Sequence, residues 1–273
     1  MKALCAGVCL LALAGCSSSG AAKRTPDRFA AAVRVAPHVR LWIACSGNGP
    51  VVLADGGLGI PTEAWAGVRH ELGHVRFCAF DRAGIGRSDV RACRCGSLER
   101  NVEDVHALIK GARLRPPIIL VGHSTGGLDA LLYARRYRSE VSGLVLVDSP
   151  SESAPVPPTR LTDGSTQLEF ASGLRELRRA RGLDGLPILI LSHGKRAFST
   201  RAAERSWTKM QRQLSADSSD TLRVIAVDSG HLIEVDQPRL VATAAEQIVA
   251  AIQEGRRLRC LPAFDAAGGR CSA

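Results

Sequence analysis

Aromatic residues are scarce in this chain, because phenylalanine, tryptophan and tyrosine together make up 4% of its 273 residues. Proteins that bind single-stranded nucleic acid use aromatic side chains for base stacking, and no nucleic-acid-binding motif is present. We therefore expect no nucleic-acid partner, although the formal net charge is +10. Most basic residues are arginines. The positive charge indicates either attraction to anionic lipid headgroups or envelope polymers, or only that arginine is the preferred basic residue of this genome.

Long apolar runs are also lacking. The run at residues 3–14 follows Lys2 and is too short for a comfortable membrane span. It leads into Leu-Ala-Gly-Cys16 and a serine-rich stretch, a pattern that resembles a bacterial lipobox. We expect residues 1–15 to be a lipoprotein signal peptide, Cys16 to carry lipid, and residues 16–38 to form the lipidated N-terminus and a tether. The protein would then be exported and anchored firmly to the membrane of the bacterial cell envelope. An ordinary secretory signal is the alternative.

Metal-binding cysteine motifs are missing too. Once the signal peptide and the lipidated cysteine are set aside, an even number of cysteines remains: Cys45, Cys78, Cys93, Cys95, Cys260 and Cys271. An even number in an exported chain favours disulfide bonds. No nearby Cys or His pair completes a zinc site with Cys93-x-Cys95, so we expect no metal.

The most informative motif is Gly122-His123-Ser124-Thr125-Gly126. An apolar run of the buried-strand type precedes it, and a helical pattern follows it. A serine between two glycines at such a junction is a nucleophile elbow, where small neighbours let strand and helix pass close together. Ser124 is the predicted nucleophile. The amide of Thr125, at the helix N-terminus, is a predicted donor to the oxyanion.

A glycine-rich turn upstream supplies a second candidate donor. The apolar run 51–54 ends in Asp55-Gly56-Gly57, where backbone amides are available to an oxyanion. We predict Gly57 as the second donor, with Leu58 as the alternative.

The predicted general base is His231. The apolar run 222–227 leads into Ser-Gly-His231, and a histidine on a loop after the last strand can reach Ser124 and take its proton. The side chain of His123 must point away from that of its neighbour, the nucleophile. His193 follows another strand and is the weaker alternative.

These motifs together resemble the α/β-hydrolase superfamily from about residue 39 to residue 252. The segments that carry the resemblance are Asp55-Gly56-Gly57, residues 81–88 (Asp-Arg-Ala-Gly-Ile-Gly-Arg-Ser), residues 122–127, residues 143–148 and Gly230-His231. Within the superfamily the chain is similar to bacterial exported serine hydrolases of the esterase type. The resemblance implies an α/β fold with a mostly parallel central sheet, helices on both faces and a short cap. The family usually begins its oxyanion turn with His-Gly, and Asp55 replaces that histidine.

The resemblance leaves two positions for the acid of the triad. In much of the family the acid follows the strand after the cap, here 186–191, but no Asp or Glu appears until Glu204. The other known position is the end of the strand after the nucleophile helix, which is Asp148. We therefore assign Asp148 to orient His231 and to stabilise its charge. The reserve acids are Asp217, Asp220 and Asp228.

The family strand order also bears on the cysteines, because it places the second strand beside the fourth and so allows Cys45 to pair with Cys78. The other four allow three pairings, which stay open. Cys260 with Cys271 would close a C-terminal loop, Cys93 with Cys95 would form a strained ring, and cross-pairing would tie the tail to an earlier loop.

The layout indicates one domain at residues 39–273, with a short cap at about 149–186 and a cysteine-containing tail. The predicted strands are 39–44, 51–54, 75–80, 118–121, 144–147, 187–191 and 222–227, and the predicted helices are 98–112, 126–137, 201–214 and 238–255. Cap residues Leu168, Phe170, Leu174 and Leu177 face either the substrate or the body of the domain.

The sequence thus predicts a serine hydrolase that cleaves an ester or related acyl bond of a small molecule through an acyl-enzyme, without a metal or organic cofactor. The nearest rival is an aminopeptidase of the same fold, in which Glu169 or Glu176 would bind the substrate amine. A non-catalytic envelope binding protein on this scaffold is the alternative from another class, suggested by Asp55 and the missing later acid. The sequence specifies neither the acyl preference nor the oligomeric state.

Overall fold

The computed structural model describes residues 28–180 and 182–272. The predicted signal peptide, the predicted lipidation site Cys16 and residues 16–27 of the predicted tether lie outside the described residues. Within the described part, no helix is both long enough and apolar enough to span a membrane.

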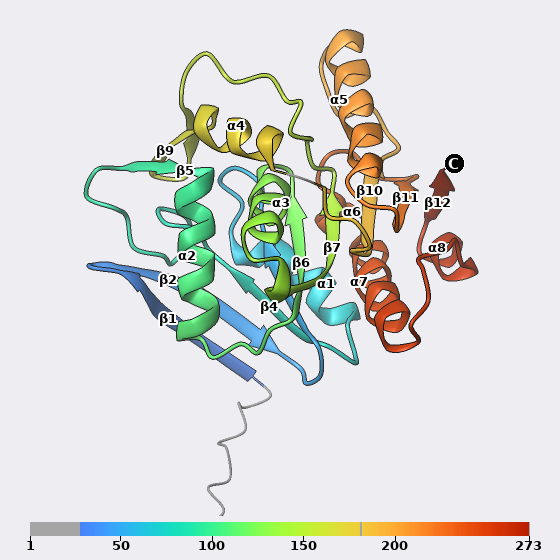
Figure 1. Ribbon diagram of the computed structural model, residues 1–273, viewed down its shortest axis with the longest axis horizontal. Helices are drawn as coiled ribbons and strands as arrows, with labels where there is room; N and C mark the ends of the chain where they lie inside the picture. Colours follow the sequence, from blue (N-terminus) through green and yellow to red (C-terminus); the bar gives the residue numbers. More distant parts are fainter. Residues whose placement is uncertain (1–27, 181, 273) are drawn as a thin grey trace, which may run out of the picture.

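A large twisted sheet forms the middle layer of the molecule (Figure 1). Its strands are β1 (Arg28–Ala36), β2 (Val39–Ser46), β3 (Val51–Asp55), β4 (Arg76–Phe80), β6 (Ile118–His123), β7 (Val141–Val147), β10 (Ile188–His193), β11 (Thr221–Ala226) and β12 (Gly269–Ser272). Their spatial order is β1-β2-β4-β3-β6-β7-β10-β11-β12. The six strands from β4 to β11 in that order run parallel, while β1, β2 and β12 pair antiparallel at the two edges. All seven predicted strands are present, with bounds shifted by a few residues at most.

Helices cover both faces of this sheet, as predicted. They are α1 (Ala66–Glu71), α2 (Leu98–Gly111), α3 (Thr125–Arg136), α4 (Ala171–Arg179), α5 (Arg201–Gln213), α6 (Ile233–Asp236), α7 (Pro238–Gln253) and α8 (Pro262–Ala266), with short 3-10 turns at Thr62–Trp65, Arg138–Glu140 and Leu214–Ala216. Adjacent strand residues point to opposite faces, so Leu120 joins the core under α2 and α3, whereas Val121 joins the core under α1 and α7. Because the central strands run parallel, their carboxyl ends meet at one edge of the sheet, where α/β folds place their sites.

The domain begins earlier than the predicted boundary at residue 39. Residues 28–36, predicted as part of the tether, form the edge strand β1, which pairs antiparallel with β2. The segment is rich in alanine and arginine, and its inward residues Phe29 and Val33 are only partly buried against the core. An edge strand with so few large apolar residues gives a weak sequence signal, which explains the error.

The cap contains strands that the sequence did not indicate. A small sheet of β5 (Cys95–Ser97), β9 (Thr166–Glu169) and β8 (Leu161–Asp163) leads into α4. Leu168, Phe170, Leu174 and Leu177 are all buried in the core, and Phe170 and Leu174 also line the cavity beside Ser124. The two orientations left open for the cap residues are thus both realised.

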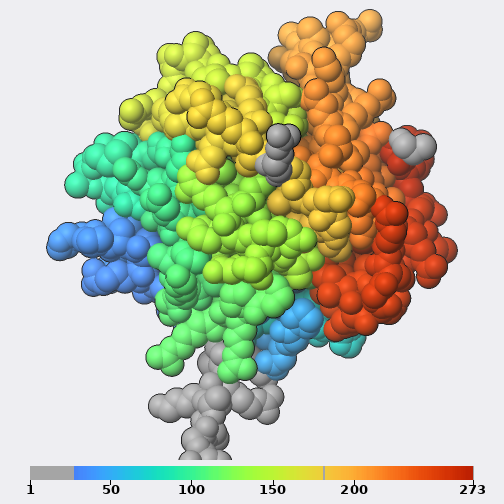
Figure 2. All heavy atoms as spheres, viewed as in Figure 1, coloured from blue at the N-terminus to red at the C-terminus, as the bar shows by residue number. Residues whose placement is uncertain are grey.

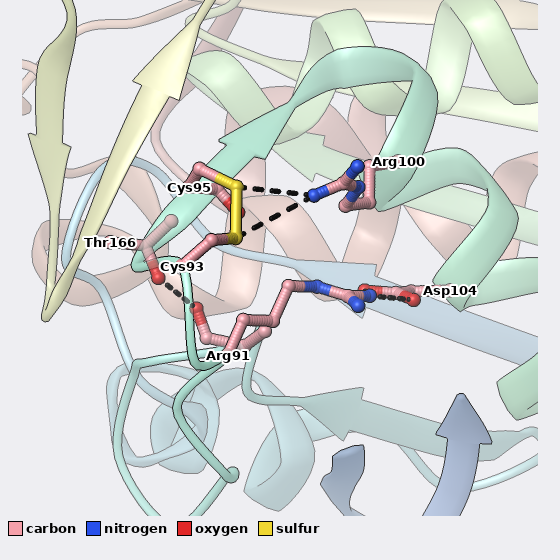
Figure 3. The surroundings of a disulfide bond; sticks show 7 residues. Arg91, Cys93, Cys95, Arg100, Asp104 and Thr166 are labelled. Carbon is pink, nitrogen blue, oxygen red and sulfur yellow. Dashed lines mark hydrogen bonds and ion pairs between the residues drawn. A yellow bond between two sulfur atoms is a disulfide. The ribbon is translucent and has the colours of Figure 1, made fainter. Parts of the chain in front are cut away.

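Residues 28–272 contain three disulfide bonds between described cysteines, which are Cys45–Cys78, Cys93–Cys95 and Cys260–Cys271. The first joins residues that face each other across β2 and β4. The second lies on the surface before α2, where Nη1 of Arg100 is 3.3 Å from Sγ of Cys95 and Arg91 pairs with Asp104 (Figure 3). Among the open pairings, the structure therefore contains the two local ones and not the cross-pairing.

Candidate active site

The elbow places Ser124 between β6 and α3 with a backbone φ of 51° and ψ of −120°. Few non-glycine residues adopt such a conformation, and it is characteristic of functional turns. A Cβ on Gly122 would lie 2.4 Å from the carbonyl oxygen of Gly126, and a Cβ on Gly126 would lie 2.6 Å from that of Asp55. Only glycine fits at either position, which is why the motif has this spacing.

The structure brings the three predicted triad residues together. Nε2 of His231 lies 3.1 Å from Oγ of Ser124, and Nδ1 of the same ring lies 2.6 Å from Oδ2 of Asp148. Asp148 follows β7, is fully buried and has a φ of 41°. His231 lies on the loop between β11 and α6, so residues far apart in sequence meet at the carboxyl edge of the sheet.

Asp148 is held in its ionised form. Burial alone would raise the pKa of this carboxyl group, but hydrogen bonds from His193 and His231 outweigh burial and lower the pKa. A charged acid beside His231 is what stabilises an imidazolium during proton transfer.

The reserve acids lie elsewhere. Asp217 pairs with Arg135, Asp220 accepts a hydrogen bond from the backbone of Leu258, and Asp228 is exposed beside Lys195. Asp148 is the acid that contacts His231.

A buried arginine shapes the predicted oxyanion turn. Nη1 of Arg82 donates to the carbonyl oxygen of Gly56 at 2.5 Å, and its Nη2 donates to that of Gly57 at 2.6 Å. The C=O and N–H groups of a trans peptide point in opposite directions, so the amides of Gly57 and Leu58 point away from Arg82. Gly57 lies against the nucleophile, since a Cβ on it would be 3.1 Å from Cβ of Ser124.

Two carboxylates hold Arg82, and they account for the unusual Asp55. Oδ1 of Asp55 accepts from Nη1 of Arg82 at 2.5 Å, and Asp163 from the cap accepts from Nε and Nη2 at 2.9 and 3.0 Å. Burial would lower the pKa of Arg82, but the charges of Asp55 and Asp163 raise it. Asp55 thus anchors the turn through Arg82. The sequence alone does not reveal this role, because the contact partners come from three separate segments.

A second buried pair lies behind His231. Nε2 of His123 is 3.0 Å from the carbonyl oxygen of His231, and its Nδ1 is 3.0 Å from Oε1 of Glu234 on α6. Burial lowers the pKa of His123 to about 3 and raises the pKa of Glu234 to about 8. At neutral pH the pair is therefore uncharged, and His123 donates to the backbone of the catalytic loop. As expected, the His123 side chain does not point toward the hydroxyl of Ser124.

A cavity of about 500 Å³ opens beside Ser124 and His231. The cap contributes Pro155, Phe170 and Leu174, and α5 contributes Trp207 and Met210. Among the described residues that line the cavity, none is an aspartate, glutamate, lysine or arginine. In the space-filling view, α5 (orange) projects beside the yellow-green cap (Figure 2). The site therefore has a polar catalytic end and apolar walls.

Neither cap carboxylate lines the cavity beside Ser124, and both already have partners. Glu169 accepts hydrogen bonds from the backbone amides of Ala171 and Ser172 at the start of α4, and Glu176 pairs with Arg136. In the described part of the chain, no group of three or more His, Cys, Asp or Glu side chains could hold a metal ion.

Residues 72–166 match the family model described as serine aminopeptidase, S33. The chain is 29% identical over 214 residues to YqjL of Bacillus subtilis, a protein described as uncharacterized, covering 72% of this chain and 82% of YqjL.

Among solved structures, a thermophilic esterase from Thermogutta terrifontis has a TM-score of 0.65 at 20% identity, over 83% of this chain and 99% of the esterase. A hydrolase from Pseudomonas aeruginosa PA01 has a TM-score of 0.61 at 16% identity, over 82% of this chain and 99% of that one. The chain has the α/β-hydrolase fold. The family match and the fold support a function of the serine-hydrolase type.

Proposed function

We propose that this protein is a serine hydrolase that cleaves the ester bond, or a related acyl bond, of an uncharged small molecule. The observation that carries the proposal is the continuous hydrogen-bonded chain Ser124–His231–Asp148 at the mouth of an apolar cavity. Such a chain makes a hydroxyl nucleophilic at neutral pH.

In the proposed reaction, Oγ of Ser124 attacks the substrate carbonyl while Nε2 of His231 takes the hydroxyl proton. The hydrogen on Nδ1 of His231 stays on the ring and forms a hydrogen bond to Asp148, whose negative charge stabilises the imidazolium. The backbone amides of Thr125 and Gly57 donate hydrogen bonds to the carbonyl oxygen and stabilise the negative charge that develops on it. His231 then protonates the leaving alcohol, and water releases the acid by the same proton transfers in reverse.

The cavity supports an apolar acyl group. Charged substrates would lose their hydration against walls that offer no opposite charge, whereas apolar carbons gain by leaving water. Phe170, Leu174 and Trp207 provide such walls within reach of Ser124.

An aminopeptidase is the rival that the family model's description favours. Recognition of a free α-amine needs a carboxylate in the site, and both candidate residues, Glu169 and Glu176, already have partners. The non-catalytic alternative was suggested by Asp55 in the oxyanion turn and by the missing acid after the later strand. Two contacts weigh against it, because Asp55 binds Arg82 and Asp148 contacts His231.

We also propose that the protein is exported and lipid-anchored at Cys16 in the bacterial cell envelope. This proposal rests on the sequence pattern of residues 13–20. Metabolic labelling with a palmitate analogue should label the wild type and not Cys16→Ala. Equal labelling of both would contradict lipidation at this cysteine.

Aryl esters from acetate to palmitate test the proposed activity. We expect kcat/KM to rise with the acyl chain until the cavity is filled, and Ser124→Ala to abolish turnover. The exposed Ser199, outside the cavity, provides a matched control, and Ser199→Ala should retain the wild-type rate. A higher kcat/KM for an amino-acid arylamide with a free amine would favour the aminopeptidase instead.

A further inference from the structure

A second histidine contacts the acid of the triad. His193 ends β10, and its Nδ1 lies 2.9 Å from Oδ1 and 2.8 Å from Oδ2 of Asp148. The backbone amide of His193 donates to Oδ1 at 3.2 Å, while His231 occupies Oδ2 at 2.6 Å. The buried carboxylate is therefore fixed by two imidazoles and one amide.

The other nitrogen of His193 also faces a carboxylate. Its Nε2 lies 2.5 Å from Oε1 of Glu204 on α5. Two ionised carboxylates can both accept from one ring only if both ring nitrogens carry hydrogen. Burial lowers the pKa of His193, but the bonds and charges of Asp148 and Glu204 outweigh burial and raise the pKa to about 9. His193 is thus a cation at neutral pH.

Glu204 connects this cation to the wall of the cavity. Its Oε2 accepts from the backbone amides of Ala197 and Phe198 at 3.2 and 3.1 Å, which holds the loop before α5. The ring of Phe198, on that loop, lies 5.8 Å from the ring of His231. The ring of Trp207, which like Glu204 is on α5, lies 5.4 Å from the ring of His231. One carboxylate therefore joins the loop, the helix and the triad.

Among the described residues, the ring of His193 contacts the carboxylates of Asp148 and Glu204 and the ring of Phe198. Lys195 and Asp228 form an exposed pair at 3.7 Å on the neighbouring loops. His231 contacts Oδ2 of Asp148, an oxygen that His193 also contacts. The ring of His193 therefore titrates between Asp148 and Glu204.

We propose that His193 and Glu204 are positioning residues of the triad, which hold the carboxylate of Asp148 toward His231 and couple that position to α5. The inference rests on the proposed function and names two further residues on which its rate depends.

The test is the pH dependence of aryl-ester hydrolysis by His193→Asn and Glu204→Gln. The asparagine can still donate to Asp148 but carries no charge. We expect its kcat to fall about 10–100-fold with KM changed much less, because the amide cannot bridge Asp148 to Glu204 and so removes the charge and the link to α5 but no substrate contact. The acid limb of its profile should move up by about half a pH unit, because a positive charge beside the triad is gone.

Glu204→Gln keeps the size of the side chain and removes the second carboxylate. Wild type should show a change in rate near pH 9 as His193 loses its proton, and this change should move to lower pH in Glu204→Gln. Since Glu204 is partly exposed on α5, this variant remains informative even if His193→Asn does not fold.

Asp228→Asn is the matched control, an aspartate on the loop after β11 that should leave both kcat and the profile unchanged. Folded variants at His193 and Glu204 with the wild-type kcat and profile would overturn this inference alone. A wild type whose Ser124 does not react with acyl substrates would overturn the proposed function as well.

Discussion

At the residue scale, the Ser124 hydroxyl depends on partners that fix charges and directions. His231 reaches both Ser124 and Asp148, while Arg82 turns the carbonyls of the glycine turn away from the nucleophile. Each of these groups is buried or half-buried, where electrostatic interactions are stronger than in water. Substitutions that keep the shape of a side chain and remove its charge therefore show how much each charged group contributes to the rate.

Asp148→Asn should lower kcat by about a thousandfold or more, because an amide cannot stabilise the His231 imidazolium and favours the wrong tautomer. Asp217→Asn removes a carboxylate that pairs with Arg135 away from the triad, so its kcat should stay near that of wild type. Steady-state kinetics on one aryl ester give both values. Near-normal turnover by Asp148→Asn would remove this residue from the triad.

Asp55→Asn tests the support of the oxyanion turn. With its charged partner gone, Arg82 should hold the carbonyls of Gly56 and Gly57 less firmly, so kcat should fall about tenfold or more while KM changes little. Arg87→Gln alters an exposed arginine in the same loop as Arg82 and should have no effect. If the two variants have equal kcat values, the turn does not need Asp55.

At the element scale, the short helix α6 carries Glu234 beneath the catalytic loop. The acid faces His123, which in turn donates to the backbone of His231. A raised pKa means that the folded protein binds this proton more tightly than the unfolded chain does. The stabilisation is therefore present at low pH and is lost as the pH rises from the ordinary glutamate range to about 8.

Glu234→Gln should remove that pH dependence. His123 titrates in the opposite sense, with its effect confined below about pH 6.5. His193, with a pKa of about 9, loses stabilisation over pH 6.5–8 in both proteins, so the difference between variant and wild type isolates Glu234. Over this window the variant should gain about 1–2 kcal/mol of unfolding free energy relative to wild type. Urea denaturation at both pH values measures the difference. Parallel changes in the two proteins would show that Glu234 has an ordinary pKa.

The elements with strong apolar patterns were predictable, and the weaker ones were not. β6 and α7 bury most of their residues and have clear periodicity, whereas β1 and the cap strands are short or only partly buried. The residues of the site likewise include some that the sequence predicts and some that it does not. Ser124 and His231 belong to local motifs, while Arg82, His193 and Glu204 act through contacts between distant segments, which no local spacing reveals.

At the scale of the whole molecule, the disulfides differ in the length of chain that they close. Cys45–Cys78 has a sequence separation of 33, Cys260–Cys271 one of 11, and Cys93–Cys95 one of 2. A longer loop loses more conformational entropy in the unfolded chain when it is closed. The bond between β2 and β4 should therefore stabilise the fold most.

Replacing Cys45 and Cys78 together by alanine should lower the free energy of unfolding by about 3–4 kcal/mol. The double variant of Cys93 and Cys95 should lose about half as much or less, because its loop is so short. Chemical denaturation of the two double variants compares them directly. An equal loss from both would contradict a stabilisation governed by loop length.

The most direct measurement of the central claim is covalent labelling by a fluorophosphonate, with the modified peptide identified by mass spectrometry. We expect wild type to be labelled at Ser124, and Ser124→Ala and His231→Ala to be folded but not labelled. A folded wild type that does not react, or one that reacts at another serine, would contradict the proposed chemistry.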